Sequence, residues 1–138
     1  MVRRILVLCV LSFASVAASS ASAREVLRFE SDLATAQRAA LQTNRLLLVH
    51  FGATWCGPCQ EMEKNVFNQP GLGTALNPYY VAVKIDVDAQ PALAKQMKVG
   101  PIPCDIVMTS AGEIVARSEG KKPAGEYVAM LNQAAQRR

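Results

Sequence analysis

The sequence lacks most of the features that would assign it to a specialised class of protein. Its 138 residues include one histidine and one tryptophan, only 6% are aromatic, and 19% are charged. No internal repeat or low-complexity stretch is present. The length corresponds to one domain, and 51% hydrophobic residues with 8 Gly and 7 Pro is the balance of a folded globular protein. Two packed domains and a disordered chain are therefore both excluded.

A basic stripe is also missing. The net charge is +4, but the basic residues are scattered, and beyond residue 23 the adjacent basic pairs are only Lys121-Lys122 and Arg137-Arg138. Such short pairs are typical of a solvated surface and not of a nucleic-acid interface. We therefore expect no nucleic-acid partner.

The first residues predict a secretory signal peptide over residues 1–23. Arg3 and Arg4 precede an apolar run at residues 5–18, and small residues lead to an expected cleavage after Ala23. The run is shorter than the ~20 apolar residues that span a membrane, so a retained anchor is the less favoured alternative. Cys9 would be removed with the peptide. We expect an exported mature chain of residues 24–138, with no stable membrane insertion, located in a bacterial periplasm or cell envelope.

Helical and strand patterns alternate along the rest of the chain. The pattern predicts strands at residues 25–30, 46–51, 80–87, 106–109 and 113–117, and helices at 33–41, 60–68, 91–97 and from about 123. Ser31 and Asp32 are candidate caps of the first helix. The apolar run 46–51 is typical of a strand buried on both faces. The inward positions are expected to be Leu33, Ala36, Ala40 and Leu41, then Met62, Val66 and Phe67, then Tyr127, Leu131 and Ala134. These elements predict an α/β fold with a central mixed β-sheet flanked by helices.

The segment Trp55-Cys56-Gly57-Pro58-Cys59 falls where a buried strand ends and a helix begins. Two cysteines three residues apart in a first helical turn lie on one face, close enough to form a disulfide. The free N–H groups of the turn stabilise a thiolate at Cys56, which predicts Cys56 as the attacking sulfur and Cys59 as the resolving sulfur. Pro58 suits a first turn, where amide groups are unpaired.

Two other uses of these cysteines stay open. A structural disulfide is one, although a four-residue loop is a weak staple. A zinc site formed by His50, Cys56, Cys59 and Cys104 is the other, although no second Cys or His pair has finger spacing. We expect no metal and no other cofactor.

The chain resembles the thioredoxin family. The resemblance rests on Trp55-Cys56-Gly57-Pro58-Cys59 after a buried strand and on Ile102-Pro103 farther along, and it covers nearly all of residues 24–138. The residues after the motif are similar to exported thioredoxin-like proteins and to the C-terminal domain of DsbD-type carriers. The resemblance implies a thioredoxin fold, and that Pro103 is a cis-proline facing the dithiol. It also implies that Ile102 offers its backbone to a substrate strand, and that Trp55 contacts substrate.

The sequence departs from the family pattern at His50, where the family usually has a buried Asp six residues before the first cysteine. Lys84 does match the family's lysine near that carboxylate. An imidazole below the dithiol could accept the Cys59 proton, or when protonated could stabilise thiolate and make the disulfide more oxidising. The Gly57-Pro58 dipeptide resembles reducing members, so the two features favour opposite potentials. A neutral core histidine without a redox role is the alternative.

The second departure is Cys104, because the residue after the cis-proline is commonly Thr. It is a candidate third thiol that captures Cys56 or holds a substrate intermediate. A buried packing role is the alternative, because free cysteine is among the most buried residue types.

The sequence as a whole predicts an exported thiol:disulfide oxidoreductase that exchanges disulfides with protein substrates. It is expected to be a monomer that needs a separate redox partner for recycling. A thioredoxin-fold peptide-binding module without redox turnover is the alternative. A Cys–His hydrolase is a third possibility, against which no group that would orient His50 is evident.

Overall fold

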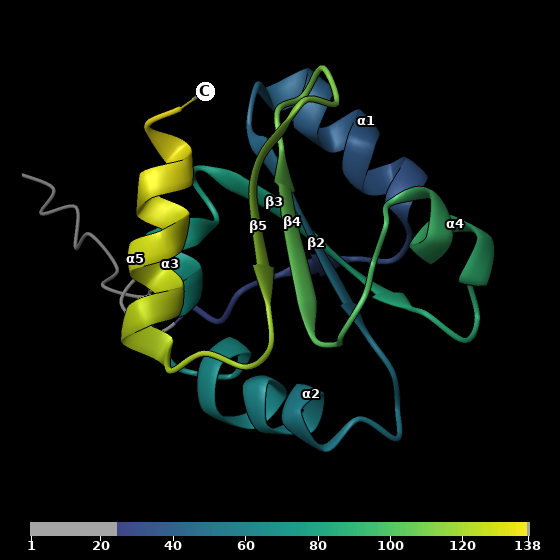
Figure 1. Ribbon diagram of the computed structural model, residues 1–138. Coiled ribbons are helices and arrows are strands. Elements are labelled where there is room, and N and C mark those ends of the chain that lie inside the picture. Colours follow the sequence, from purple (N-terminus) through teal and green to yellow (C-terminus); the bar gives the residue numbers. More distant parts are fainter. Residues whose placement is uncertain (1–24, 138) are drawn as a thin grey trace, which may run out of the picture.

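The computed structural model describes residues 25–137 (Figure 1), so the predicted signal peptide, including Cys9, lies outside the described residues. The strands are β1 (Phe29–Glu30), β2 (Leu46–Gly52), β3 (Tyr80–Asp86), β4 (Cys104–Met108) and β5 (Ile114–Glu119). The helices are α1 (Leu33–Thr43), α2 (Gly57–Met62), α3 (Leu72–Leu76), α4 (Pro91–Gln96) and α5 (Ala124–Ala135), with a π-helical segment η2 (Glu63–Phe67) directly after α2.

The five strands form one mixed sheet in the order β1-β3-β2-β4-β5. β1, β3 and β2 run parallel, whereas β4 is antiparallel to β2 and β5 is antiparallel to β4. β2 lies at the centre and is buried along its whole length, as expected for a strand covered on both faces. The predicted α/β architecture with a central mixed sheet and flanking helices, the thioredoxin fold, is confirmed.

Helices cover both faces of the sheet, and each face has its own apolar core (Figure 1). α1 and α4 pack on one face, which we call the α1/α4 face, over Val49 and Phe51. α2, η2, α3 and α5 pack on the other, the α2/α5 face, over Leu46 and Leu48. Because successive side chains of a strand point to opposite faces, each residue of β2 and β4 belongs to one core only.

The N-terminal strand is shorter than expected. Residues 25–30 predict a strand, but only Phe29–Glu30 pairs with β3. The preceding residues instead dock on α3, where the amides of Gly71 and Gly73 donate to the Glu25 carbonyl at 3.2 and 2.8 Å. A Cβ at Gly73 would overlap the Val26 carbonyl oxygen, so glycine permits this close approach. α3 itself is absent from the sequence prediction.

Two further expectations need correction. Leu41 does not face inward: it is 62% exposed, whereas Ala36 and Ala40 of the same helix are buried. The helix after the cysteines begins at Gly57 and continues as a π-helical turn, which holds both Val66 and Phe67 in the core. The predicted inward positions in α2, η2 and α5 are confirmed by the burial of Met62, Val66, Phe67, Tyr127, Leu131 and Ala134.

The helices between residues 25 and 137 are also short. None of them combines the length and the apolar composition that crossing a bilayer requires.

Candidate active site

Cys56 and Cys59 form a disulfide at the end of the central strand. Cys56 is the N-cap of α2, and its Sγ accepts the Cys59 amide at 3.2 Å. The two Cα atoms are 5.2 Å apart. Cys56 and Cys59 are only 3% and 8% exposed as residues, so the disulfide is largely covered. An extended substrate must therefore dock closely for its sulfur to reach them.

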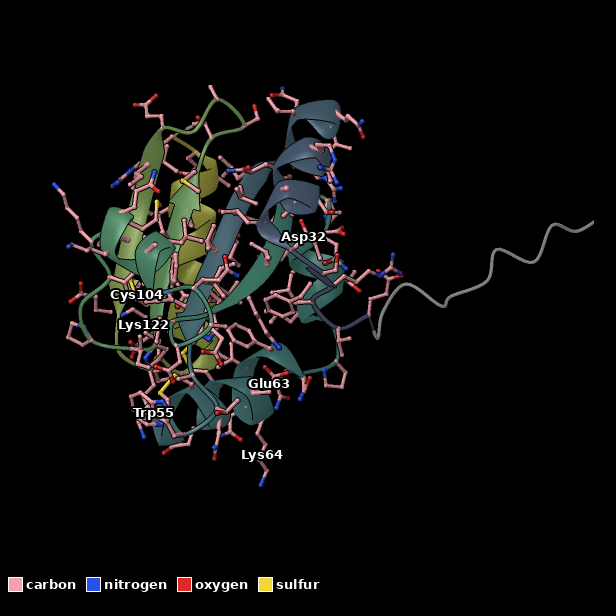
Figure 2. The ribbon with its side chains drawn as sticks, turned by 90° about the vertical axis from the view of Figure 1, so that its right-hand side faces the viewer. Asp32, Trp55, Glu63, Lys64, Cys104 and Lys122 are labelled. Carbon is pink, nitrogen blue, oxygen red and sulfur yellow. A yellow bond between two sulfur atoms is a disulfide. The ribbon has the colours of Figure 1, made fainter. Side chains whose placement is uncertain are left out.

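An exposed aromatic ring borders the dithiol. Trp55 is 68% exposed, and its Nε1 donates to the Asp88 carboxylate at 2.6 Å. Figure 2 shows Trp55 and Glu63 at the α2 end of the molecule. Gly57 and Pro58, also exposed, form the rest of this rim. The rim offers apolar surface beside sulfurs that are themselves covered.

The Ile102-Pro103 peptide bond is cis. Pro103 is buried and Ile102 is partly exposed. The next residue, Cys104, pairs with Phe51 of β2, which places the cis-proline at the sheet end from which α2 starts. The structure thus brings Ile102 and Pro103 to the same end of the sheet as the dithiol.

His50 belongs to a buried polar network on the α2/α5 face. Its Nδ1 lies 2.8 Å from Oδ1 of Asp105, and the Tyr127 hydroxyl donates to the same oxygen at 2.9 Å. The Phe67 ring packs edge-on against the imidazole, with 4.8 Å between ring centroids. Burial, and next the Asp105 carboxylate, raise the pKa of Tyr127 well above its ordinary value. Tyr127 is therefore a neutral hydrogen-bond donor at physiological pH.

A cleft of about 280 Å³ connects His50 with the resolving cysteine. Its lining includes His50, Gly52, Cys59, Glu63 and Lys84. A Cβ built on Gly52 would lie 3.3 Å from Sγ of Cys59 and 3.5 Å from Nε2 of His50. A small group at that point therefore contacts both reactive atoms at once.

Lys84 enters this cleft but does not bond to His50. It pairs in register with His50 across β3 and β2, yet its ammonium forms an ion pair with Glu63 and lies 4.1 Å from the centroid of the Phe29 ring. The salt bridge is more than a third exposed on both sides. Lys84 thus forms one wall of the opening to the cleft.

Cys104 lies in the core of the α1/α4 face and is free. Its Sγ is 3.6 Å from Nη1 of Arg117. Burial raises the pKa of this thiol, and the Arg117 charge only partly opposes the shift. The geometry favours packing and an unreactive thiol.

The structure separates the residues of the zinc alternative. His50 and Cys104 come from opposite faces of the sheet, and residues 25–137 contain no cluster of three or more His, Cys, Asp or Glu side chains suited to a metal ion. The expectation that nothing orients His50 is wrong, because Asp105 does so. The sequence analysis does not identify Asp105 or Tyr127 as site residues. Asp105 is the single acidic residue in the otherwise apolar stretch 104–108, and that position is the signal that could have identified it.

Comparisons with known proteins agree on one family. The model of the thioredoxin-like domain matches residues 33–135. A thioredoxin-like protein of Synechocystis sp. is 39% identical over 85 residues, which cover 62% of this chain and 77% of that protein. Thioredoxin of Chlamydia muridarum is 36% identical over 87 residues, which cover 63% of this chain and 80% of that protein.

Solved structures show the same architecture. The oxidoreductase DsbH superposes with a TM-score of 0.73 at 19% identity, with 92% of this chain and 96% of that chain covered. A thioredoxin from Thermus thermophilus superposes with a TM-score of 0.70 at 27% identity, with 79% of this chain and 87% of that chain covered. The first of these two likenesses shows the fold alone.

Proposed function

This chain belongs to the thioredoxin-like family, and from that premise we propose that it is an exported thiol:disulfide oxidoreductase acting on protein substrates. The observation that carries the proposal is the Cys56–Cys59 disulfide at the N-terminus of α2, at the same end of the sheet as a cis-proline. Its relatives include proteins named thioredoxin. A labile pair closing a four-residue loop serves redox exchange better than it serves stability.

In the reducing direction the cycle begins with the thiolate of Cys56. It attacks one sulfur of a substrate disulfide, which forms a Cys56–substrate disulfide and releases the other substrate sulfur as thiolate. Cys59 then loses its proton and attacks Sγ of Cys56, which breaks the mixed disulfide. The substrate gains two electrons, and the protein ends with the Cys56–Cys59 disulfide. The oxidising direction is the same sequence in reverse.

The residues around the dithiol supply the docking surface. Trp55 offers an exposed ring, and the partly exposed Ile102 next to the cis-proline offers backbone groups to an extended substrate strand. Because the sulfurs are nearly covered, this docking selects substrates that can bring a disulfide into the rim. After each turnover, a separate redox partner returns the Cys56–Cys59 pair to its starting oxidation state. The protein acts as a monomer.

Insulin reduction in the presence of dithiothreitol tests the activity. We expect turnover by the wild type, none by Cys56→Ser, and near-normal turnover by the matched control Cys104→Ser on the other face of the sheet. A wild type that binds peptides without reducing insulin would instead identify a passive binding module. If the wild type does reduce insulin, trapping with Cys59→Ser identifies its substrates, because the mixed disulfide between Cys56 and the substrate cannot be resolved.

Export is tested separately. The apolar run at residues 5–18 after Arg3 and Arg4 supports a signal peptide. Expression of the full chain in a bacterium should give a periplasmic protein whose N-terminus, by mass spectrometry, is Arg24. A cytosolic protein that retains residues 1–23 would contradict export and leave the redox proposal intact.

A further inference from the structure

The most unusual feature of the interior is a carboxylate without solvent. Asp105 is 1% exposed, and among residues 25–137 its Oδ2 has no hydrogen-bond partner. Its Oδ1 meets Nδ1 of His50 at 2.8 Å and the Tyr127 hydroxyl at 2.9 Å. Burying such a group is costly unless it is paired. The function of Asp105 is therefore expected to depend on its two hydrogen-bond partners, His50 and Tyr127.

The network determines which nitrogen of His50 can accept a proton. With its carboxylate ionised, Asp105 only accepts hydrogen bonds, so a neutral imidazole bonded to it carries the hydrogen on Nδ1. Tyr127 donates its own hydroxyl to the same oxygen, which fixes the carboxylate from a second element, α5. Nε2 is then a free acceptor.

Nε2 of His50 and the sulfur of Cys59 lie close to the same point beside Gly52. The point that a Cβ of Gly52 would occupy is 3.5 Å from Nε2 and 3.3 Å from Sγ of Cys59, and both side chains line the same cleft. A water molecule fits a polar space of this kind when it has hydrogen-bond partners on both sides. The cleft of about 280 Å³ that both side chains line is large enough to hold such a water beside Gly52.

We propose that Asp105 is a positioning residue for the resolving step: together with Tyr127 it holds the His50 imidazole so that Nε2 takes the proton of Cys59. This inference rests on the proposed function and deepens it. The His–Asp pair lies at the position where the family pattern has a buried Asp.

The step balances as follows. In the mixed disulfide, the Cys59 proton passes to Nε2 through the space beside Gly52, and the resulting imidazolium is stabilised by the Asp105 carboxylate at Nδ1. The Cys59 thiolate attacks Sγ of Cys56, a Cys56–Cys59 bond forms, and the Cys56–substrate bond breaks. The substrate leaves as a thiolate with the electron pair of that bond. The imidazolium later releases its proton to solvent through the cleft.

Other charges around the cleft bear on the pH dependence. The titratable groups that belong to the His50 network or line the same cleft are Asp105 on β4, Tyr127 on α5, Cys59 on α2, Glu63 on η2, and Lys84 and Asp86 on β3. Glu63 and Lys84 pair with each other at the cleft opening. The Asp105 carboxylate therefore remains the charge in direct contact with the ring.

A stopped-flow reaction of the reduced protein with an equal amount of dithiobisnitrobenzoate separates the two steps. Attack by Cys56 releases one coloured thiolate, and resolution by Cys59 releases the second. We expect Asp105→Asn to slow the second phase by roughly 10- to 100-fold near neutral pH and to leave the first unchanged. The asparagine amide can donate to Nδ1, which moves the hydrogen to Nε2 and removes the acceptor.

The pH profile distinguishes proton transfer from a structural defect. The second phase of the wild type should slow in acid and level off at higher pH, because only a neutral imidazole accepts a proton, whereas that of Asp105→Asn should rise steadily with pH as hydroxide replaces the imidazole. Ser118→Ala is the matched control: this buried serine pairs with Asp105 across β4 and β5, and its hydroxyl has no partner within the described residues. It should leave both phases unchanged.

Two further variants keep the test valid if Asp105→Asn does not fold. Gly52→Ala places a methyl group within contact distance of both Nε2 and Sγ and should slow only the second phase, while Tyr127→Phe should slow it less. If all folded variants keep the wild-type second phase, or slow both phases equally, the proposal is wrong. If the wild type itself gives no Cys56-dependent first phase, the proposed function fails instead.

Discussion

The two faces of the sheet receive residues from the same strands but are built from different chemistry. On the α1/α4 face, β2 and β4 contribute Val49, Phe51, Cys104 and Ile106 to an apolar core. On the α2/α5 face the same strands contribute His50 and Asp105, which bond to each other and, through Asp105, to Tyr127. Alternation along each strand separates the two sets.

The difference follows the position of the dithiol. α2 packs on the face that carries the polar network, and Cys59 shares a cleft with His50. Burying polar groups is unfavourable unless they are paired, and on this face His50, Asp105 and Tyr127 pair with one another. The α1/α4 face should therefore decide stability, and the α2/α5 face should also decide reactivity.

The largest expected effect is on the α1/α4 face. Phe51→Ala should lower the free energy of unfolding by about 3–5 kcal/mol, because a fully buried ring leaves a cavity. Urea denaturation of the oxidised protein measures it, with Phe51→Leu as the milder control. The redox midpoint should not move. A loss below about 1 kcal/mol would show that this face is not tightly packed.

On the α2/α5 face, His50→Asp should make the dithiol more reducing. A second carboxylate beside Asp105 disfavours a nearby thiolate and so destabilises the reduced form. We expect a shift of several tens of millivolts in a glutathione redox titration, where about 30 mV is a tenfold change in the equilibrium. Val49→Ala, on the opposite face, is the control. If His50→Asp shares the wild-type midpoint, His50 has no redox role.

Cys104 should behave as a core residue and not as a third active thiol. Cys104→Ala should cost about 1 kcal/mol of stability and leave the redox midpoint unchanged. In the native oxidised protein, none of Cys56, Cys59 and Cys104 should react with iodoacetamide, and after denaturation only Cys104 should. Labelling of Cys56 or Cys59, read by peptide mapping, would show that the disulfide pairing is wrong.

The smallest effect concerns the start of α1. Asp32 caps this helix, and the Thr35 amide, which donates to it at 2.8 Å, is the main reason that its pKa is lowered to about 2. Because folding lowers the pKa of Asp32, its ionised carboxylate stabilises the folded state at pH values above the pKa of an unfolded Asp, about 3.9. That stabilisation is lost as the pH falls towards about 2. Asp32→Asn should therefore be slightly less stable at neutral pH and equal to the wild type at about pH 2. A difference that persists in acid would indicate that the charge is not the cause.

Much of the site could be predicted from local sequence. The turn from a buried strand to a helix at residues 52–57 positions the cysteine pair whatever the rest of the chain does, because the free amides at a helix start are a local property. The cis bond before Pro103 likewise falls in a Pro-rich turn. The family resemblance added the expectation that these two features meet.

Other features could not be predicted, because they depend on which strands pair and in what register. Asp105 is 55 residues from His50 in the chain and reaches it only because β4 runs antiparallel to β2 in one particular alignment. A shift of one residue would send Asp105 to the other face. The exposure of Leu41 has a related cause: helical spacing shows which residues share a face, but not what covers that face.

The sequence by itself determined the redox pair, the order of the strands and of every helix except α3, and the change from a carboxylate to an imidazole at position 50. Those properties depend on residue identity and on spacing within a few residues. Only the tertiary structure decided that this imidazole bonds to the Asp105 carboxylate and shares a cleft with Cys59. It also decided that Cys104 lies on the opposite face of the sheet. Contacts between distant strands depend on how the sheet is assembled, since a strand's own pattern shows only which residues share a side.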